Sequence, residues 1–451
     1  MATISPFRAL RYDPSRAPLS DVVTQPYDKI HPAAQEHYYQ VNPHNLVRII
    51  LGKISPSDDE VNNVYSRAAT HFADWRREGV FLQDSQPSIY VYSQRFTMPG
   101  GKEEIERTGF IALGHLEDYS SKVVFRHEHT LAKPKADRLN LLRATRAHFG
   151  QLFMLYSDPG AEIEGLLAPR GEPDMNVRDE YGVSHRVWRI ADSTLIELVR
   201  GKMQDKKLII ADGHHRYETA LAYRDERRTA PAAGTGIPRE RSSAGDMVRS
   251  GGNNDAPFEY AMMTFINMDS PGLMILPTHR LVHSLSSLSP ETFAAAASEY
   301  FEVEEVDASV DAPRATSILR EAGRSGTALL AITAERAFLL DRAKTLASES
   351  LREFSPQQQE LDVVQLHKCV LERVLGISAE ATRNQENISY TREASEALAK
   401  VRDGSANIAF LMNPVRMEQV REIAFAGEVL PQKSTDFYPK LLSGLTIYAL
   451  E

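Results

Sequence analysis

The sequence has a single cysteine, Cys369, among its 451 residues. An intramolecular disulfide is therefore excluded, and so are disulfide-stapled scaffolds, cysteine-rich zinc domains and iron–sulfur proteins. Long apolar runs are also missing, because the run over residues 328–333 is far shorter than the ~18 residues that a membrane span needs. The first residues, MATISPFRALRYDPSRAP, contain no apolar core of a secretory signal. These absences predict a cytoplasmic protein that does not enter a membrane.

The chain also lacks an excess of positive charge. Its 52 Lys and Arg residues are outnumbered by 61 Asp and Glu residues, which gives a formal net charge of −9. This balance disfavours a general nucleic-acid-binding surface but leaves a local basic pocket open. With 42% hydrophobic and 25% charged residues the composition is that of a globular protein, long enough for about three domains or one large domain with insertions.

Several common catalytic signatures are absent as well. No G-x-G-x-x-G follows a strand, which disfavours a Rossmann dinucleotide site, and there is no G-x-x-x-x-G-K-[ST] P-loop. The G-x-S-x-G elbow of hydrolases and the H-R-D and D-F-G sets of protein kinases are also missing. Any enzymatic activity must therefore depend on other motifs.

Apolar periodicity predicts a mixed α/β fold. Apolar residues at i, i+3 and i+4 predict a helix over residues 58–79, and alternation predicts two strands, over 88–98 and 107–119, joined by a turn. A stretch rich in Gly, Ser, Pro, Arg and Asn, over residues 229–257, predicts a mobile loop. The other predicted elements are a basic helix over 137–148, strands over 153–156, 184–190, 408–412 and 445–449, and helices over 193–203, 361–375 and 416–426.

The clearest motif is ADGHHRYETA, over residues 211–220. It follows an apolar strand, so Asp212 is expected at the strand's carboxyl end, and Gly213 permits a turn that a side chain would block. His214, His215 and Arg216 then fall at a helix N-terminus, where free N–H groups and the helix dipole attract anions. The alternative is an N-cap aspartate with a salt bridge such as Arg216–Glu218. Because that alternative explains two adjacent histidines poorly, an anion or metal site is favoured.

A second polar cluster is FRHEHT, over residues 125–130, followed by KPKADR. On a strand His127 and His129 would share one face, so they could bind a metal ion while Glu128 acts as a base. The spacing does not match the H-E-x-x-H zinc motif. The alternative is a solvated loop held by salt bridges of Arg138, and both interpretations stay open.

Three weaker motifs complete the candidates. His279 and Arg280 end a predicted strand, and a surface ion pair is the favoured interpretation there. QKST, over residues 432–435, together with Lys440 resembles part of a phosphate-binding set, although a polar loop with a hydroxyl-stabilised turn is favoured in isolation. QPYDKI, over residues 25–30, predicts an ordered turn that carries Tyr27 and Asp28.

QPYDKI, HEHT with DRLNLLRAT, ADGHHRYETAL, PGLMILPTHRLV and QKSTDFYPKLLSGL occur together and in this order. The set resembles the bacterial and archaeal family called domain of unknown function 1015, over residues 7–445. The family's usual P-P-Y-D-V-I is QPYDKI here, and Asp436 replaces the aromatic residue of its usual Q-K-S-T-Y-F. The resemblance implies one family-wide unit. Within it we expect an N-terminal subdomain over 1–160, a core over 161–285, and a C-terminal α/β subdomain over 286–451 that returns to the site through 431–440.

The D-G-H-H-R turn is also similar, over five or six residues, to the D-G-H-x-R motif of free serine kinases in the ParB/sulfiredoxin superfamily. This likeness implies a ParB/sulfiredoxin-like nucleotide-binding core elaborated with further α/β subdomains. It also implies that Asp212 aligns the acceptor or a magnesium ion, and that residues 213–216 hold the transferring phosphates. Glu128 is the candidate for the catalytic glutamate. The predicted catalytic residues are therefore Asp212, Glu128 and His215. The further candidates are Gly213, His214, Arg216, Arg138, His279, Arg280, Lys433, Ser434 and Thr435 for phosphate, and Tyr27, Asp28 and His127 for substrate.

Three functions follow from these motifs. The first is a phosphotransferase that uses ATP or ADP with Mg²⁺ and acts on a small hydroxylated metabolite such as L-serine. The second is a metal-dependent hydrolase or phosphatase that uses the His and Asp residues as ligands. The third is a nucleotide or anion sensor without catalysis. All three imply small-molecule partners and no nucleic acid, and a homodimer is left open.

Overall fold

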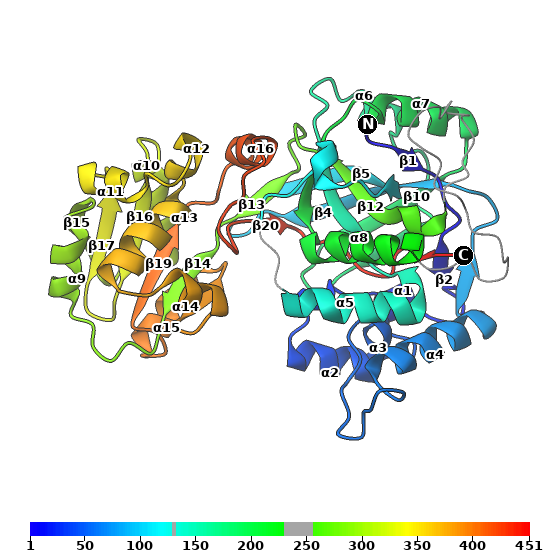
Figure 1. Cartoon of the computed structure of the whole chain (residues 1–451), viewed down its shortest axis with the longest axis horizontal. Coiled ribbons are helices and arrows are strands. Elements are labelled where there is room, and N and C mark those ends of the chain that lie inside the picture. Colours follow the sequence, from blue (N-terminus) through cyan, green and yellow to red (C-terminus); the bar gives the residue numbers. More distant parts are fainter. Residues whose placement is uncertain (129–131, 230–255) are drawn as a thin grey trace. The chain divides into compact units, whose positions relative to one another are not determined.

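The computed structural model describes residues 1–128, 132–229 and 256–451 (Figure 1). His129 and all but the ends of the loop expected over 229–257 lie outside these residues. The chain divides into two compact units. The first comprises Met1–Val124, Thr130–Gly272 and Pro439–Glu451, and the second comprises Phe125–His129 and Leu273–Tyr438. No helix of the described part is long and apolar enough to cross a membrane.

A mixed sheet forms the centre of the first unit. Its strands are β1 (Ile4–Ser5), β4 (Ile89–Thr97), β5 (Glu104–His115), β8 (Leu152–Tyr156), β9 (Met175–Arg178), β10 (Ser184–Ile190), β11 (Leu208–Asp212) and β12 (Tyr260–Asn267). Within the unit the order is β11-β8-β12-β5-β4-β10-β9, and β1 also pairs with β5. Strands β8 and β12 are parallel, whereas the other pairs are antiparallel. The predicted mixed α/β class is confirmed.

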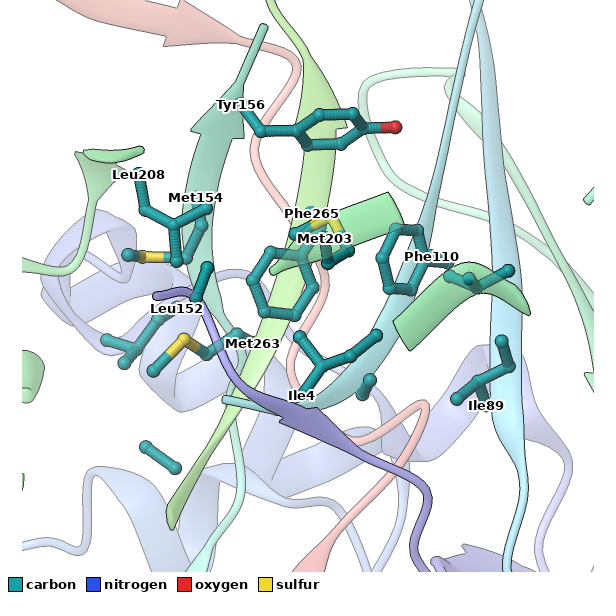
Figure 2. Packing of buried hydrophobic residues seen from close by; sticks show 14 of the residues in the cluster. Ile4, Ile89, Phe110, Leu152, Met154, Tyr156, Met203, Leu208, Met263 and Phe265 are labelled. Carbon is teal, nitrogen blue, oxygen red and sulfur yellow. The ribbon is translucent and has the colours of Figure 1, made fainter. Parts of the chain in front are cut away.

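One face of this sheet carries the unit's main apolar core (Figure 2). Alternate residues of the central strands point to this face, among them Phe110, Met154 and Phe265, and each is almost fully buried. Two helices, α7 (Ser193–Met203) and α8 (His214–Thr229), add buried apolar side chains to the same core. Burying a side chain of this size contributes roughly 1.5–3 kcal/mol, so the position of α8 on the sheet is strongly determined.

A helical layer packs beside α8. Helix α5 (Ala132–Thr145) contacts both α8 and α4 (Val64–Arg77), and Figure 1 shows it between them. Phe72, Trp75 and Leu141 belong to the apolar core of this layer. The other helices of the unit are α1 (Leu19–Val22), α2 (Pro32–Val41), α3 (Val47–Ile50) and α6 (Glu162–Leu166), with a 3₁₀ turn at Tyr27–Lys29. This layer brings the QPYDKI turn into the unit that also carries α8.

The last segment of the chain belongs to the first unit. β21 (Tyr448–Ala449) pairs with β7 (Ala147–His148), and isolated bridges join Thr24 to Ser443 and Leu10 to Ile447. Strand β2 (Leu10–Tyr12) pairs in turn with β3 (Phe81–Gln83). Residues 439–451 thus become part of a unit whose other residues end at Gly272.

The second unit contains an antiparallel sheet in the order β15-β17-β16-β19-β14-β18. These strands are β14 (His279–Val282), β15 (Glu302–Val306), β16 (Ala328–Ile332), β17 (Ala337–Asp341), β18 (Ile388–Thr391) and β19 (Ile408–Met412); β13 (Met274–Leu276) pairs with β20 (Asp436–Tyr438). The helices are α9 (Pro290–Ala297), α10 (Ala312–Ala322), α11 (Thr345–Ser350), α12 (Pro356–Gln359), α13 (Asp362–Gln365), α14 (Ala379–Asn384), α15 (Ala394–Arg402) and α16 (Met417–Phe425). A π-helix, Leu366–Val374, continues α13 and buries Cys369.

Several predicted elements have other bounds in the structure, and two of the differences lie next to the site. The basic helix expected over 137–148 is α5, which begins at Ala132 and ends at Thr145 because Arg146 adopts a positive φ of 49°. The two residues after Arg146 form strand β7 instead. The strand expected over 445–449 is β21, which is confined to Tyr448–Ala449 and pairs with β7. Pairing between residues so far apart in the chain leaves no local sequence pattern.

Candidate functional site

The junction between β11 and α8 is built around one aspartate and one glycine. The pairing of β11 with β8 shifts register between Ile210 and Asp212, which places Asp212 opposite Phe153. Such bulges often re-aim a side chain beside a functional site. Gly213 follows with a φ of +94°, and α8 begins directly at His214. The predicted strand, turn and helix are therefore confirmed.

The turn depends on the missing side chain of Gly213. A Cβ atom there would lie 3.0 Å from both Arg216 Nη2 and Leu152 Cδ2, in a backbone conformation that disfavours L residues. We expect Gly213→Ala to lower the free energy of unfolding by about 1–3 kcal/mol, measured by urea denaturation. Gly165→Ala is the matched control, because Gly165 has no atom within 4 Å of an added Cβ. Equal effects of the two substitutions would contradict a strained turn.

Asp212 is held between two cations. Its Oδ2 accepts a hydrogen bond from Arg216 Nη2 at 2.8 Å, and its Oδ1 lies 3.5 Å from Lys440 Nζ. The side chains are mostly buried, with exposed fractions of 21% for Asp212, 19% for Arg216 and 10% for Lys440. Burial opposes ionisation of Asp212, but the charges of Lys440, Arg216, Lys29 and His214 outweigh it and hold the pKa of this carboxyl well below its usual range.

Arg216 is fixed at both ends of its guanidinium. Besides its bond to Asp212, its Nη1 donates to the backbone carbonyl of Gln151. Glu218, the partner considered from the sequence, pairs instead with Lys135. A side chain at residue 150 would also crowd this region, since a Cβ on Gly150 would lie 3.3 Å from Arg216 Nη1. The guanidinium is therefore presented in one defined orientation.

A pocket opens beside Arg216. Its volume of about 70 Å³ is several times the roughly 10–15 Å³ that admits one water molecule. The lining is mainly apolar with a few polar groups, and comprises Pro26, Tyr27, Ile50, Arg138, Leu141, Leu142, Ala147, His148, Phe149, Gly150, Leu152, Arg216, Thr219 and Ser443. An apolar pocket with few convergent polar groups is the usual form of a small-molecule site.

Two predicted residues meet at this pocket. The Arg138 guanidinium lies 4.0 Å from the centre of the Tyr27 ring, within the range of a cation–π contact. Arg138 also donates to the Ile50 carbonyl at 2.7 Å and to Asp137 at 2.8 Å. Burial is the main cause that raises the pKa of Tyr27 to about 12, so its hydroxyl stays protonated at neutral pH. Asp28, its neighbour, is exposed and does not line the pocket.

Three residues at this site escaped the predicted set. His148 lines the pocket, and burial together with the charge of Arg216 lowers its pKa to about 4, so it is neutral at neutral pH. Lys440, which the sequence grouped with the weak QKST motif and not with the site candidates, lies beside Asp212. Gln151 is 1% exposed, and among the residues that the structure describes neither polar atom of its side-chain amide has a hydrogen-bond partner. Because an unpaired buried amide is costly, a bound water or ligand is the usual partner.

The second unit gathers another part of the predicted set. His127 Nε2 lies 2.8 Å from Thr435 Oγ1, and Lys433 N donates to Glu128 Oε1 at 3.1 Å. Ser434 donates its hydroxyl to the Pro431 carbonyl, as the hydroxyl-stabilised turn would require. His127 and Glu128 are therefore brought to the QKST loop, although about 300 residues separate them in the chain.

The predicted surface ion pair at residues 279 and 280 is wrong. His279 and Arg280 are 4% and 1% exposed, because β14 lies inside the sheet between β18 and β19. Arg280 donates to the Lys433 carbonyl at 3.0 Å, and its guanidinium lies 5.4 Å from the Tyr390 ring centre. His279 Nδ1 accepts from Met412 N at 3.3 Å, and burial lowers the pKa of His279 to about 4. Arg280 therefore stabilises the QKST loop through its hydrogen bond to the Lys433 carbonyl.

The predicted residues thus fall into two groups. Those in the first unit are Tyr27, Asp28, Arg138, Asp212, Gly213, His214, His215 and Arg216, and those in the second are His127, Glu128, His279, Arg280, Lys433, Ser434 and Thr435. A single cleft shared by both groups stays a prediction. Within the described residues, no group of three or more His, Cys, Asp or Glu side chains is arranged to hold a metal ion.

Comparison with known proteins identifies the family. The model described as "Protein of unknown function (DUF1015)" matches residues 4–364. The chain belongs to this family. The matched range includes the QPYDKI, HEHT, ADGHHR and PTHR motifs, whereas the QKST segment follows it. No curated protein matches the chain significantly.

Three solved structures show low similarity. A free serine kinase variant in complex with AMP is 12% identical with a TM-score of 0.37, covering 72% of this chain and 88% of its own. A conserved hypothetical protein from Pyrococcus furiosus is 13% identical with a TM-score of 0.35, covering 73% and 92%. SbnI with a C-terminal truncation, from Staphylococcus aureus, is 8% identical with a TM-score of 0.33, covering 74% and 85%.

Proposed function

We propose that this protein is a nucleotide-dependent phosphotransferase whose phosphate site is the β11–α8 junction. The observation that carries the proposal is the ionised Asp212 held between Arg216 and Lys440 at the N-terminus of a 16-residue helix. ATP or ADP with Mg²⁺ is the proposed donor. The acceptor is a small hydroxylated metabolite, and L-serine is the first to test because of the D-G-H-x-R likeness.

The cations and the helix N-terminus suit the donor's phosphates. The first N–H groups of a helix point out of its N-terminal end, and together with the helix dipole they favour an anion there. Arg216 offers a planar, permanently charged guanidinium, and Lys440 offers a compact ammonium group. Because phosphoryl transfer is mainly positioning and charge neutralisation, these groups supply most of what the reaction needs.

Asp212 has the properties of the group that aligns the acceptor or binds magnesium. Its lowered pKa keeps it ionised, and a phosphate that attracts Arg216 and Lys440 would leave the carboxylate oxygens available. Mg²⁺ is usually held by one or two carboxylates together with substrate phosphates and water. One carboxylate beside a phosphate site therefore fits this ion. Bound there, Mg²⁺ would neutralise charge that develops on the phosphates.

The pocket beside Arg216 is the proposed place for the organic part of a ligand. It shares Arg216 with the phosphate site, and Thr219 one turn further along α8 also lines it. Its apolar lining and the neutral His148 favour an uncharged group there. The unpaired amide of Gln151, whose carbonyl binds Arg216, is a further candidate for ligand binding.

The metal-dependent hydrolase is less well supported. A structural or catalytic zinc site uses three or four protein ligands, and the described residues contain no such group. The sensor would use the same phosphate site without turnover. Glu128 as a base, a cytoplasmic location and the absence of nucleic-acid partners stay predictions.

The test is incubation of the protein with ATP or ADP, Mg²⁺ and a panel of hydroxylated metabolites that includes L-serine. We expect a phosphorylated product by mass spectrometry and ³¹P NMR, with ADP or AMP formed in equal amount. Nucleotide binding without any product would favour the sensor. No product and no thermal shift with either nucleotide would reject the proposal.

A further inference from the structure

A buried polar network lies behind Lys440 on the sheet of the first unit. Arg107, in β5, is 1% exposed and donates to Gln94 Oε1, in β4, and to the Pro439 carbonyl. Gln94 is also 1% exposed, and its Nε2 donates to the Lys440 carbonyl at 2.8 Å. The two side chains therefore bind the carbonyls of the two peptide groups that flank the Cα atom of Lys440.

The same network also contacts the strand that pairs with Asp212. The Arg107 guanidinium lies 4.8 Å from the ring centre of Phe153, which pairs with Asp212 in the β8–β11 register. Tyr92 adds a third attachment, since its hydroxyl lies 3.4 Å from Leu442 N. The segment that carries Lys440 and the strand that pairs with Asp212 thus contact a common set of buried side chains.

Stability alone accounts poorly for this arrangement. Removing a guanidinium from water is costly, and well-packed apolar residues commonly replace buried charges without loss of stability. Here the guanidinium and an amide both bind the backbone next to one residue, Lys440, whose ammonium lies beside the proposed phosphate site. A flexible lysine side chain gains a defined position only if its backbone is fixed.

We infer that Arg107 is a positioning residue that, together with Gln94, places the Lys440 ammonium against Asp212. Its catalytic consequence rests on the proposed function, whereas the placement itself does not. Arg107→Lys keeps the charge but cannot form the same planar fork. Gln94→Met removes the bond to the Lys440 carbonyl at similar volume and serves as an independent second variant.

The placement is tested by the carboxyl titration of Asp212, followed by ¹³C NMR in the full-length protein. Lys440→Met should raise the pKa of Asp212 toward the ordinary value of about 3.9; Arg216, Lys29 and His214 continue to lower it. Arg107→Lys and Gln94→Met should raise it in the same direction. Combining either substitution with Lys440→Met should raise the pKa of Asp212 no further than Lys440→Met alone, because both substitutions act through Lys440.

Arg224→Lys is the matched control. Arg224 is also buried, and it donates to the Leu116 carbonyl at 2.8 Å without a bond to residues 439–442. It should leave the Asp212 titration unchanged even if it lowers stability. An unchanged titration in Arg107→Lys and Gln94→Met, or an effect that persists in full in the Lys440→Met background, would overturn the inference.

Turnover provides the second readout. If the proposed function holds, Arg107→Lys should lower kcat by about 100-fold, the loss that a misplacement of one ångström can cause. The same loss should not occur in Arg224→Lys. A wild-type protein without turnover would reject the proposed function but leave the NMR result standing. Intact turnover with an unshifted Asp212 in both variants would reject the positioning role alone.

Discussion

Asp212→Asn should abolish most phosphoryl transfer while nucleotide binding is retained. Asparagine keeps the shape of aspartate but cannot accept a proton from the acceptor hydroxyl, and it is a poorer ligand for magnesium. We expect kcat to fall by about 10²–10⁴-fold. Without Mg²⁺ the nucleotide should bind at least as tightly, because a negative charge beside its phosphates has been removed. Product formation and calorimetric titration on the same preparation measure the two quantities.

Asp225→Asn is the control for this substitution. Asp225 is another carboxylate of α8 that pairs with an arginine, Arg224, but it is 59% exposed. Its replacement should leave both kcat and nucleotide affinity unchanged. If Asp212→Asn kept full activity, or if it lost nucleotide binding in the absence of Mg²⁺ together with activity, Asp212 would not have the assigned role.

Arg216→Ala should weaken nucleotide binding by roughly 1.5–3 kcal/mol, the range for a hydrogen bond to a charged group. That corresponds to a Kd about 10- to 150-fold higher. The loss has two causes. The phosphates lose a charged hydrogen-bond donor, and the carboxylate of Asp212 loses the partner that holds it at 2.8 Å. Isothermal titration with ADP and ATP in the presence of Mg²⁺ measures the change.

Arg228→Ala provides the comparison at the other end of the same helix. Arg228 pairs with Glu259 near the C-terminus of α8 and is 46% exposed. Its loss removes one positive charge from the helix but none from the proposed phosphate site, so the Kd should not change. Equal Kd values for the wild type and Arg216→Ala would remove Arg216 from that site.

Much of the local structure was predictable from the sequence. The strand Ser184–Ile190 and the helix Ser193–Met203 have the expected bounds, because alternation, periodicity and the Asp192 cap all act within a few residues. The helix expected over 58–79 begins later, at Val64, where the capping box of Asn63 starts it. Local signals thus determine the type of each element better than its ends.

The candidate site was predictable in its centre but not in its surroundings. An apolar strand, a glycine and a polar helix N-terminus together predict the D-G-H-H-R turn. For the segment that carries Lys440, the family resemblance was the only basis for expecting a return to the site, through residues 431–440. The position of His148 depends on the pairing of β7 with β21, which no local pattern predicts. The buried state of Arg280 was missed for a related reason, since only the pairing of β14 on both sides encloses it.

The most direct test of the account is a crystal structure of the protein with ADP and Mg²⁺. The account predicts that the phosphates lie at the N-terminus of α8, within hydrogen-bond distance of the backbone N–H groups of residues 214–216 and of the Arg216 or Lys440 side chain. Phosphates bound elsewhere on the chain, with the Asp212–Lys440 ion pair undisturbed, would contradict it.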